Sequence, residues 1–379
     1  MTAVSASPPA SLPRSPYFVS ALWDFALMGG ASILCFAVMR LFTDNVRTPG
    51  IIAAGAALAW VVNWPHFAAT SARLYGSREN LRQYPVTAVM APVLVVVGVF
   101  ASMGSPEVVA PWFLKLFMFW SPYHFSGQTV GLTMLYARRT GFTFTPMMRL
   151  CLSTFVFGSY LQPIVRFEVT PYGSQYYGVP YPSFGIPGWS VDVVLALMVI
   201  AVVGFVVLTG RKIWLEKRAL PPIILLPAVT QFIWFIPGGS WATFAEFVPL
   251  FHSVQYMLVA WSMRLKERLD GGDQEPSPKF VITESLRWYV VILIGGGVLF
   301  SGLPQLMSMA SGTTIWFSTA IVIAGVQIHH FFVDGVIWKL RSRSVRSPML
   351  GTFSELVGRA EAAEAAEATE APPRTSSHD

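Results

Sequence analysis

The chain has 379 residues, of which 54% are hydrophobic and only 12% are charged. A soluble domain carries about 25% charged residues, so this chain has too few charges to cover its surface in water. The net charge of +6 comes from Lys and Arg in short clusters between apolar segments, a pattern typical of membrane topology rather than of nucleic-acid binding. We therefore expect an integral membrane protein that has the lipid bilayer as a partner and does not bind nucleic acid.

The two ends of the chain differ in composition from the rest. Residues 1–20 are rich in Pro and Ser and lack the basic start and apolar core of a cleavable signal peptide, so we interpret them as a disordered cytoplasmic tail. Residues 346–379 are low in complexity and predict a second disordered cytoplasmic tail. A transmembrane helical domain is expected between them, over residues 21–345. Cys35 and Cys151 both lie in apolar segments, so neither a disulfide framework nor a Cys-x-x-Cys metal site is expected.

Ten segments are long and apolar enough to be membrane spans. A helix needs about 20 mostly apolar residues to cross the hydrocarbon core. The first segment is weakened by Asp24 and Arg40, and the seventh contains three prolines. The pattern predicts an all-α fold, a polytopic transmembrane helical bundle of about ten spans. In chain order the segments are residues 21–42, 51–72, 85–104, 109–136, 147–166, 190–210, 219–236, 242–263, 286–304 and 313–338.

The connections between these segments predict the orientation. Basic residues follow the second, fourth, sixth, eighth and tenth segments, whereas the alternate connections carry almost none. Positively charged loops remain on the cytoplasmic side. We therefore expect both termini in the cytoplasm, with the chain in a bacterial-type inner membrane. The one long external connection, residues 167–189, is rich in Tyr, Pro and Gly, which is typical of an interfacial aromatic loop; the alternative is a lid over a lipid-facing cavity.

The histidines are the strongest functional signal. Five of the six lie within predicted spans, where ionisable side chains are costly and usually functional. They occupy four even-numbered spans, at depths of roughly 10–21 Å from the cytoplasmic end at about 1.5 Å per residue. One such histidine is usually a packing residue, but four at a shared depth predict a convergent metal site. Its expected ligands are His66, His124, His252 and His329; His330 points about 100° away from His329 on the helix and is not expected to be a ligand.

Polar side chains accompany these histidines at spacings of three to five residues, which places most of them on the same helical face. Metal-bound imidazoles usually donate their second ring N–H to such groups. We therefore expect a supporting shell around the ligands. Its members are Asn63, Gln128, Gln255, Tyr256, His330 and Asp334.

The ligand set narrows the possible chemistry. Imidazoles without thiolates suit Fe, Zn, Cu or Ni, and paired histidines also serve as axial ligands of haem. The HExxH motif of intramembrane zinc proteases is missing from the sequence, and six histidines are too few for the His boxes of membrane desaturases. The residues alone therefore leave iron, another divalent metal, haem and no metal at all as open alternatives.

The four histidine segments resemble a known family. In the same order, they are similar to the motifs PHG…D, HFG…D, HSxxH and PHxxxxD of the bacteriorhodopsin-related β-carotene dioxygenases (Brp/Blh). The resemblance covers these segments alone. It implies a non-haem Fe(II) oxygenase in which four imidazoles hold one iron and an isoprenoid or carotenoid-like substrate enters from the lipid. The segments read PHF at 65–67, YHF at 123–125, FHS at 251–253 and IHHFFVD at 328–334.

The chain also departs from the family motifs. Ser71 and Thr129 stand where the first two motifs have Asp, and Tyr256 replaces the second His of HSxxH. These departures put the substrate and the activity in question. Aromatic residues near the histidines are candidates for the wall of a substrate cavity, namely Trp64, Tyr123, Phe125, Tyr256 and Phe331.

Three other functions stay open from the sequence. A transporter or proton-coupled permease would use the histidines and Asp334 as a relay, although the polar groups gather in one leaflet and no inverted repeat is visible. A haem-binding electron carrier would use paired histidines as axial ligands. A subunit of a larger membrane complex is the third alternative. The favoured hypothesis is a metal-dependent oxidoreductase that acts on a hydrophobic small molecule.

Overall fold

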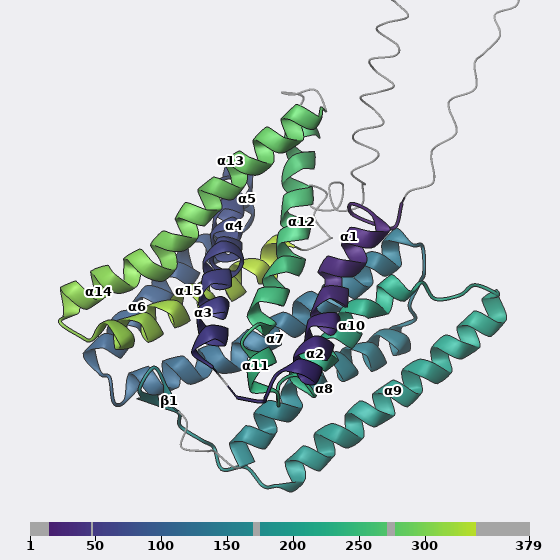
Figure 1. The fold of residues 1–379 in the computed structure, drawn as a ribbon, viewed down its shortest axis with the longest axis horizontal. Helices are drawn as coiled ribbons and strands as arrows, with labels where there is room; N and C mark the ends of the chain where they lie inside the picture. Colours follow the sequence, from purple (N-terminus) through teal and green to yellow (C-terminus); the bar gives the residue numbers. More distant parts are fainter. Residues whose placement is uncertain (1–14, 47, 170–174, 271–276, 339–379) are drawn as a thin grey trace, which may run out of the picture.

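The computed structural model describes residues 15–46, 48–169, 175–270 and 277–338. The described chain is almost entirely helical, with one two-stranded hairpin before α9 (Figure 1). The prediction of an all-α protein is confirmed. The predicted tails at residues 1–14 and 346–379 lie outside the described residues, as do the last residues of the predicted helical domain.

The helices are interrupted by four short π-helical turns, η1 to η4. In chain order the elements are α1 Ala21–Phe25, η1 Ala26–Gly30, α2 Ala31–Phe42, α3 Pro49–Leu58, η2 Ala59–Asn63, α4 Trp64–Tyr75, α5 Arg78–Gln83, η3 Val86–Met90, α6 Ala91–Gly104, α7 Val109–Arg139, α8 Pro146–Val169, β1 Gln175–Tyr176, β2 Val179–Pro180, α9 Trp189–Glu216, α10 Pro222–Phe235, α11 Ala242–Ala245, α12 Val248–Asp270, α13 Pro278–Gly297, η4 Val298–Gly302, α14 Leu303–Ser311 and α15 Ile315–Ile337.

All ten predicted segments are helical, and seven helical stretches among the described residues are long and apolar enough to cross a membrane. The other three predicted segments correspond to α7, α10 and α12. Helix α10 has 14 residues, short of a full span, while α7 and α12 are long enough but carry more polar side chains. The seven stretches are Ala21–Phe42, Pro49–Tyr75, Val86–Gly104, Pro146–Val169, Trp189–Glu216, Pro278–Ser311 and Ile315–Ile337. They support a multi-pass membrane protein.

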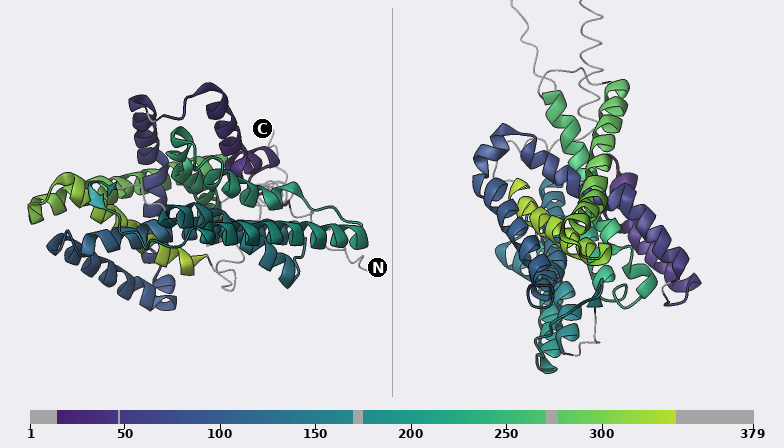
Figure 2. Two further views of the ribbon diagram at one scale, coloured as in Figure 1. Left: turned by 90° about the horizontal axis from the view of Figure 1, so that it is seen from below. Right: turned by 90° about the vertical axis from the view of Figure 1, so that its left-hand side faces the viewer.

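Helix α15 is the central element. In its most apolar window 67% of the residues are buried, against at most 33% in the other six candidate spans. It packs against α4, α6, α7 and α14. Helices α8 and α9 form an antiparallel hairpin on one side of the bundle, and α12 and α13 form a second hairpin (Figures 1 and 2). Side chains on α15 are therefore placed in the interior of the bundle.

The predicted N-terminal tail extends too far, because residues 15–20 are packed against the bundle. The Asp24 carboxylate accepts hydrogen bonds from the backbone N–H of Phe18 at 2.6 Å and of Val19 at 3.0 Å. It also accepts one from the Tyr136 hydroxyl at 2.8 Å, and the Phe18 ring is fully buried. Asp24, which weakened the first predicted span, is thus a buried anchor that ties the start of the chain to α7.

Proline accounts for three of the four π-helical turns. Each of η2, η3 and η4 ends just before a helix with proline at its second position: Pro65, Pro92 and Pro304. Proline has no N–H and cannot bond to the carbonyl four residues back, so the preceding turn widens. The carbonyl that Pro65 leaves free is that of Val61, and it accepts a hydrogen bond from the Tyr289 hydroxyl at 2.6 Å. This turn lies just before α4, the helix that carries His66.

A buried ion pair holds the loop after α8. Lys115 Nζ lies 2.9 Å from Glu168 Oε1 and donates to the Pro182 carbonyl at 2.6 Å. Its ammonium also lies 3.4 Å from the centre of the Phe184 ring. Tyr181 donates to Glu168, and this carboxylate together with burial raises the pKa of the Tyr181 phenol. The described part of the predicted interfacial loop is therefore fixed to α7 and α8.

Because one member of a buried ion pair is strongly unfavourable alone, we expect Lys115→Met to lower the free energy of unfolding by roughly 3–5 kcal/mol. Thermal unfolding of the detergent-purified protein measures the effect. The double variant Lys115→Met/Glu168→Gln, which carries neither charge, should recover part of the loss. An unchanged unfolding temperature in Lys115→Met would show that the pair does not hold the loop.

Candidate metal centre

Four histidines from four helices meet inside the bundle. His66 lies on α4, His124 on α7, His252 on α12 and His330 on α15, and each offers a ring nitrogen within 4.8 Å of the other three. His66, His252 and His330 are each 1% exposed, and the side chain of His124 is 9% exposed. The predicted convergence of four imidazoles at one depth is therefore present in the structure.

The spacing of the ring nitrogens suits one metal ion. His330 Nε2 lies 3.0 Å from His66 Nε2 and 3.2 Å from His124 Nε2. With metal–nitrogen bonds of about 2.1 Å, neighbouring ligand nitrogens lie about 3.0 Å apart in octahedral and about 3.4 Å apart in tetrahedral geometry. Three helices thus already hold their imidazoles at the separation that a shared ion requires.

His252 gives independent evidence of a missing ligand. Its ring is stacked on Phe125, with centroids 3.8 Å apart, and neither of its ring nitrogens has a hydrogen-bond partner. Buried polar groups are nearly always hydrogen-bonded, so a fully buried imidazole with two free nitrogens needs another partner. A metal ion at the centre of the cluster would satisfy one of these nitrogens. Hydrogen bonding among the imidazoles leaves both of them unpaired.

The structure does not bring His329, predicted as the fourth ligand, into the cluster; His330, expected in the supporting shell, lies there instead. The His329 ring faces away from the cluster and is stacked on Tyr75, whose hydroxyl lies 2.8 Å from His329 Nε2. The two histidines diverge by about 100° around α15. Depth in the membrane is the same for both, so only the rotation of α15 about its axis distinguishes them.

The support of His66 includes a residue that the sequence did not single out. The Ser253 hydroxyl lies 3.1 Å from His66 Nδ1 and donates to Asn63 Oδ1 at 2.7 Å. The Asn63 carbonyl lies 3.3 Å from the same ring nitrogen. Asn63 therefore lies behind the His66 ring, where a supporting residue is expected. The signal for Ser253 was its position next to His252 in the motif FHS.

Gln128 and Gln255 support the backbone rather than the imidazoles. The Gln128 side chain donates to the His252 carbonyl and to Gln255 Oε1, both at 3.2 Å. Gln255 in turn donates to the Met28 carbonyl at 2.7 Å. The two amides link α7, α12 and the turn η1. They fix the position of α12 relative to the other helices at the level of the cluster.

Tyr256 and Asp334 lie on the side of the cluster nearest the C-terminal end of α15. The Tyr256 ring packs on the His66 ring with centroids 4.7 Å apart, and Thr70 donates to the Tyr256 hydroxyl at 2.5 Å. Asp334 Oδ2 lies 3.5 Å from the Nε2 atoms of both His124 and His330. Both residues are thus in the predicted neighbourhood of the metal centre.

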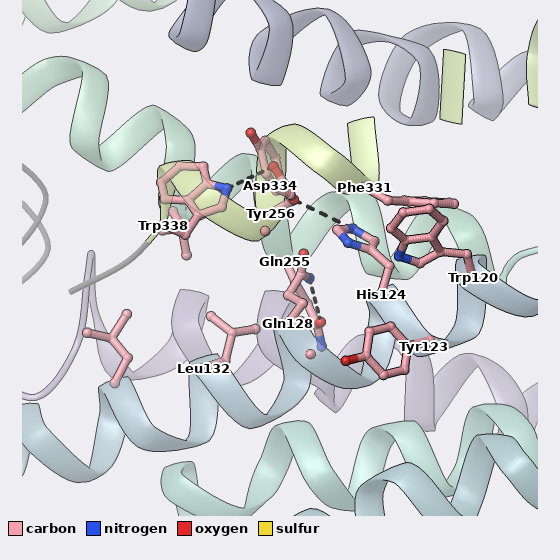
Figure 3. Close-up of a pocket in the computed structure, with 15 residues that line it drawn as sticks. Trp120, Tyr123, His124, Gln128, Leu132, Gln255, Tyr256, Phe331, Asp334 and Trp338 are labelled. Atoms are coloured by element: carbon pink, nitrogen blue, oxygen red, sulfur yellow. Dashed lines mark hydrogen bonds and ion pairs between the residues drawn. The ribbon is translucent and has the colours of Figure 1, made fainter. Parts of the chain in front are cut away.

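A cavity of about 390 Å³ adjoins the cluster, and His124 forms part of its wall. Its other walls come from α7, α12 and α15, with Trp120 on one side and Trp338 on the other (Figure 3). Three of its lining residues are glycines at which an added Cβ would meet no neighbouring atom: Gly127, Gly131 and Gly335. The cavity opens at the surface of the bundle, where the lining residue Tyr123 is 51% exposed.

Three of the five predicted wall residues line this cavity, namely Tyr123, Tyr256 and Phe331. The other two do not: Phe125 is stacked on His252, and Trp64 is stacked on Phe300. The described residues 175–188 of the loop between α8 and α9 are not part of the lining, so the predicted alternative of a lid does not apply to them and this cavity.

No protein-family model, curated protein or solved structure gives a significant match to this chain. The function is therefore argued from the geometry of the centre and of its cavity.

Proposed function

We propose that this protein is a membrane-embedded, metal-dependent oxygenase that binds Fe(II) and acts on a lipid-soluble, isoprenoid or carotenoid-like substrate. The observation that carries the proposal is the four-histidine cluster beside an apolar cavity. The proposed ligands are His66, His124, His252 and His330. The resemblance of the histidine motifs to the Brp/Blh dioxygenases supports His66, His124 and His252. In the last motif the His-x-x-x-x-Asp spacing falls on His329 and Asp334, so His330 is proposed from its position in the cluster.

The donor set favours a single borderline metal ion. Four neutral imidazoles without thiolates suit Fe(II), and an iron site with an open position can supply the chemistry that activates dioxygen. The side chains of this protein fix the ligand geometry and exclude water from the centre. Neighbouring imidazole rings have centroids 4.4 Å to 5.4 Å apart. This packing leaves no space for a porphyrin between them, which argues against haem.

The cavity supports a long apolar substrate. On α7 its lining runs from Trp120 to Leu135, a rise of about 22 Å at 1.5 Å per residue. Its walls are mainly apolar and aromatic and include neither Lys nor Arg. Pockets of this kind bind apolar ligands and use a few polar groups to orient them. We propose that the substrate enters sideways from the bilayer at the exposed side near Tyr123 and lies against His124.

We also propose the finer topology. All ten helical segments would cross or enter the membrane, with both termini in the cytoplasm of a bacterial-type inner membrane. The alternation of basic and uncharged connections supports this orientation. It places the histidine cluster in the cytoplasmic half of the bilayer.

Metal analysis and an absorption spectrum of the detergent-purified protein test the proposal. We expect stoichiometric iron, no Soret band, and oxygen consumption when a carotenoid or a shorter polyisoprenoid is added. A Soret band would instead support a haem protein. A protein that binds no metal would contradict the oxygenase and leave the transporter or the complex subunit as the better hypothesis.

A further inference from the structure

The two oxygens of the Asp334 carboxylate have different surroundings. Oδ1 accepts a hydrogen bond from Trp338 Nε1 at 2.9 Å and lies 3.3 Å from the Thr70 hydroxyl oxygen. Oδ2 lies 3.5 Å from the Nε2 atoms of both His124 and His330. The side chain is only 5% exposed. One oxygen is therefore held in place while the other is directed at the cluster.

A carboxylate that binds the metal and one that only supports a histidine ligand approach different nitrogens of the imidazole ring. A carboxylate that supports a metal-bound histidine accepts a hydrogen bond from the ring nitrogen remote from the metal. Here the nitrogens that converge on one another are the Nε2 atoms of His66, His124 and His330. Asp334 Oδ2 lies on this converging side, not behind the rings. It occupies the position of a ligand.

The distances agree with this position. Two ligand atoms that share one ion lie about 3.0–3.4 Å apart when each is about 2.1 Å from the metal. The two Oδ2–Nε2 distances of 3.5 Å are close to that range. A small rotation of the carboxylate about the oxygen fixed by Trp338 would bring Oδ2 into the coordination sphere.

The negative charge of the buried Asp334 carboxylate also favours a role as a metal ligand. Within the described ranges, Asp334 forms a close contact with its two neighbouring imidazoles and no ion pair with a Lys or Arg side chain, although Arg73 is near enough to act on it electrostatically. Arg73, whose guanidinium lies over the Trp338 ring, pairs with Glu267 at 2.9 Å. A buried carboxylate is costly unless a cation accompanies it, and a divalent ion among neutral imidazoles equally needs an anion. Asp334 and the metal would neutralise each other in part.

We infer that Asp334 is the fifth protein ligand of the metal ion, bound through Oδ2, so that the centre is a four-histidine, one-carboxylate site. The inference rests on the proposed metal centre but not on its oxygenase activity. With five protein ligands, the centre would need no ligand atom from the organic substrate. A substrate with no metal-binding group suits the apolar cavity.

Cobalt(II) substitution tests the inference, because the visible spectrum of Co(II) reports its coordination number. We expect Asp334→Asn, which keeps the shape of the side chain, to intensify the visible bands as a ligand is lost. The Kd for Co(II) should rise at least about 100-fold, the upper end of what loss of a supporting group behind a metal-bound imidazole causes. A wild-type spectrum and Kd in Asp334→Asn would overturn the inference.

A thiolate provides a positive signal at the same position. Asp334→Cys should show an ultraviolet thiolate-to-Co(II) charge-transfer band, which requires a direct sulfur–metal bond. The matched control is Ser253→Cys, because the Ser253 hydroxyl contacts His66 Nδ1, behind the ring, at 3.1 Å. A band in the control but not in Asp334→Cys would contradict the inference. If the wild-type protein binds no Co(II), the metal centre itself fails, an outcome distinct from failure of Asp334 as a ligand.

Discussion

Replacing His330 with alanine should remove the bound metal, whereas replacing the adjacent His329 should leave the metal content unchanged. The reason is the rotation of α15: His330 Nε2 lies 3.0 Å and 3.2 Å from two other ring nitrogens of the cluster, while His329 is paired with Tyr75. Four ligands of one ion act together, so we expect His66→Ala, His124→Ala and His252→Ala to lose the metal as well.

His329→Ala is a demanding control, because it removes the same side chain one residue away on the same helix. Iron per chain, measured on protein that elutes as a single folded species, decides the result. Loss of iron in His329→Ala with full retention in His330→Ala would reverse our assignment. Retention of full iron in any one of the four cluster variants would remove that residue from the ligand set.

Replacing Gly127 with leucine should abolish substrate turnover and leave the iron in place. Gly127 lies three residues after His124 on α7, lines the cavity, and has open space where a side chain would extend. A leucine there would fill the cavity close to the metal and displace the substrate. Because misplacement of a substrate by about 1 Å can cost 100-fold in rate, we expect a loss of at least about 100-fold.

A second glycine provides the control for this experiment. Gly210 is also exposed on a helix, α9, with open space around its Cβ position, but it does not line the cavity. Both substitutions should favour the helix slightly, because glycine destabilises a helix interior by roughly 0.5–1 kcal/mol relative to alanine. Gly210→Leu should retain activity. Equal activity in the two leucine variants would show that the substrate does not use this cavity.

Hydropathy and charge were sufficient to predict most of the fold. All ten predicted segments are helical because each element in a bilayer must satisfy its backbone hydrogen bonds internally, and apolar length is a direct sign of this. The depth of the histidines below the basic loops also predicted which four helices would meet. Both signals are local in sequence, and for that reason they were available without a structure.

The features that the sequence did not predict depend on how a helix is rotated about its axis and on contacts between residues far apart in the chain. His329 and His330 have the same depth, and the packing of α15 against its neighbours decides which ring enters the cluster. Lys115 and Glu168 are 53 positions apart, and no sequence pattern predicts that they form an ion pair. Residues 15–20 were predicted to belong to a tail because residues 1–20 are rich in Pro and Ser. Their contacts come from Asp24 on α1 and from α7.

The separation of the four imidazoles along the chain has a consequence for biogenesis. His66 and His330 are 264 positions apart, and α15 is the last helix of the described chain. A nascent chain that has inserted its earlier helices still lacks the fourth imidazole and Asp334. The complete ligand set exists only after α15 has entered the bundle. Metal loading would then occur after synthesis of the transmembrane part, and a loaded centre would mark a chain whose assembly is finished.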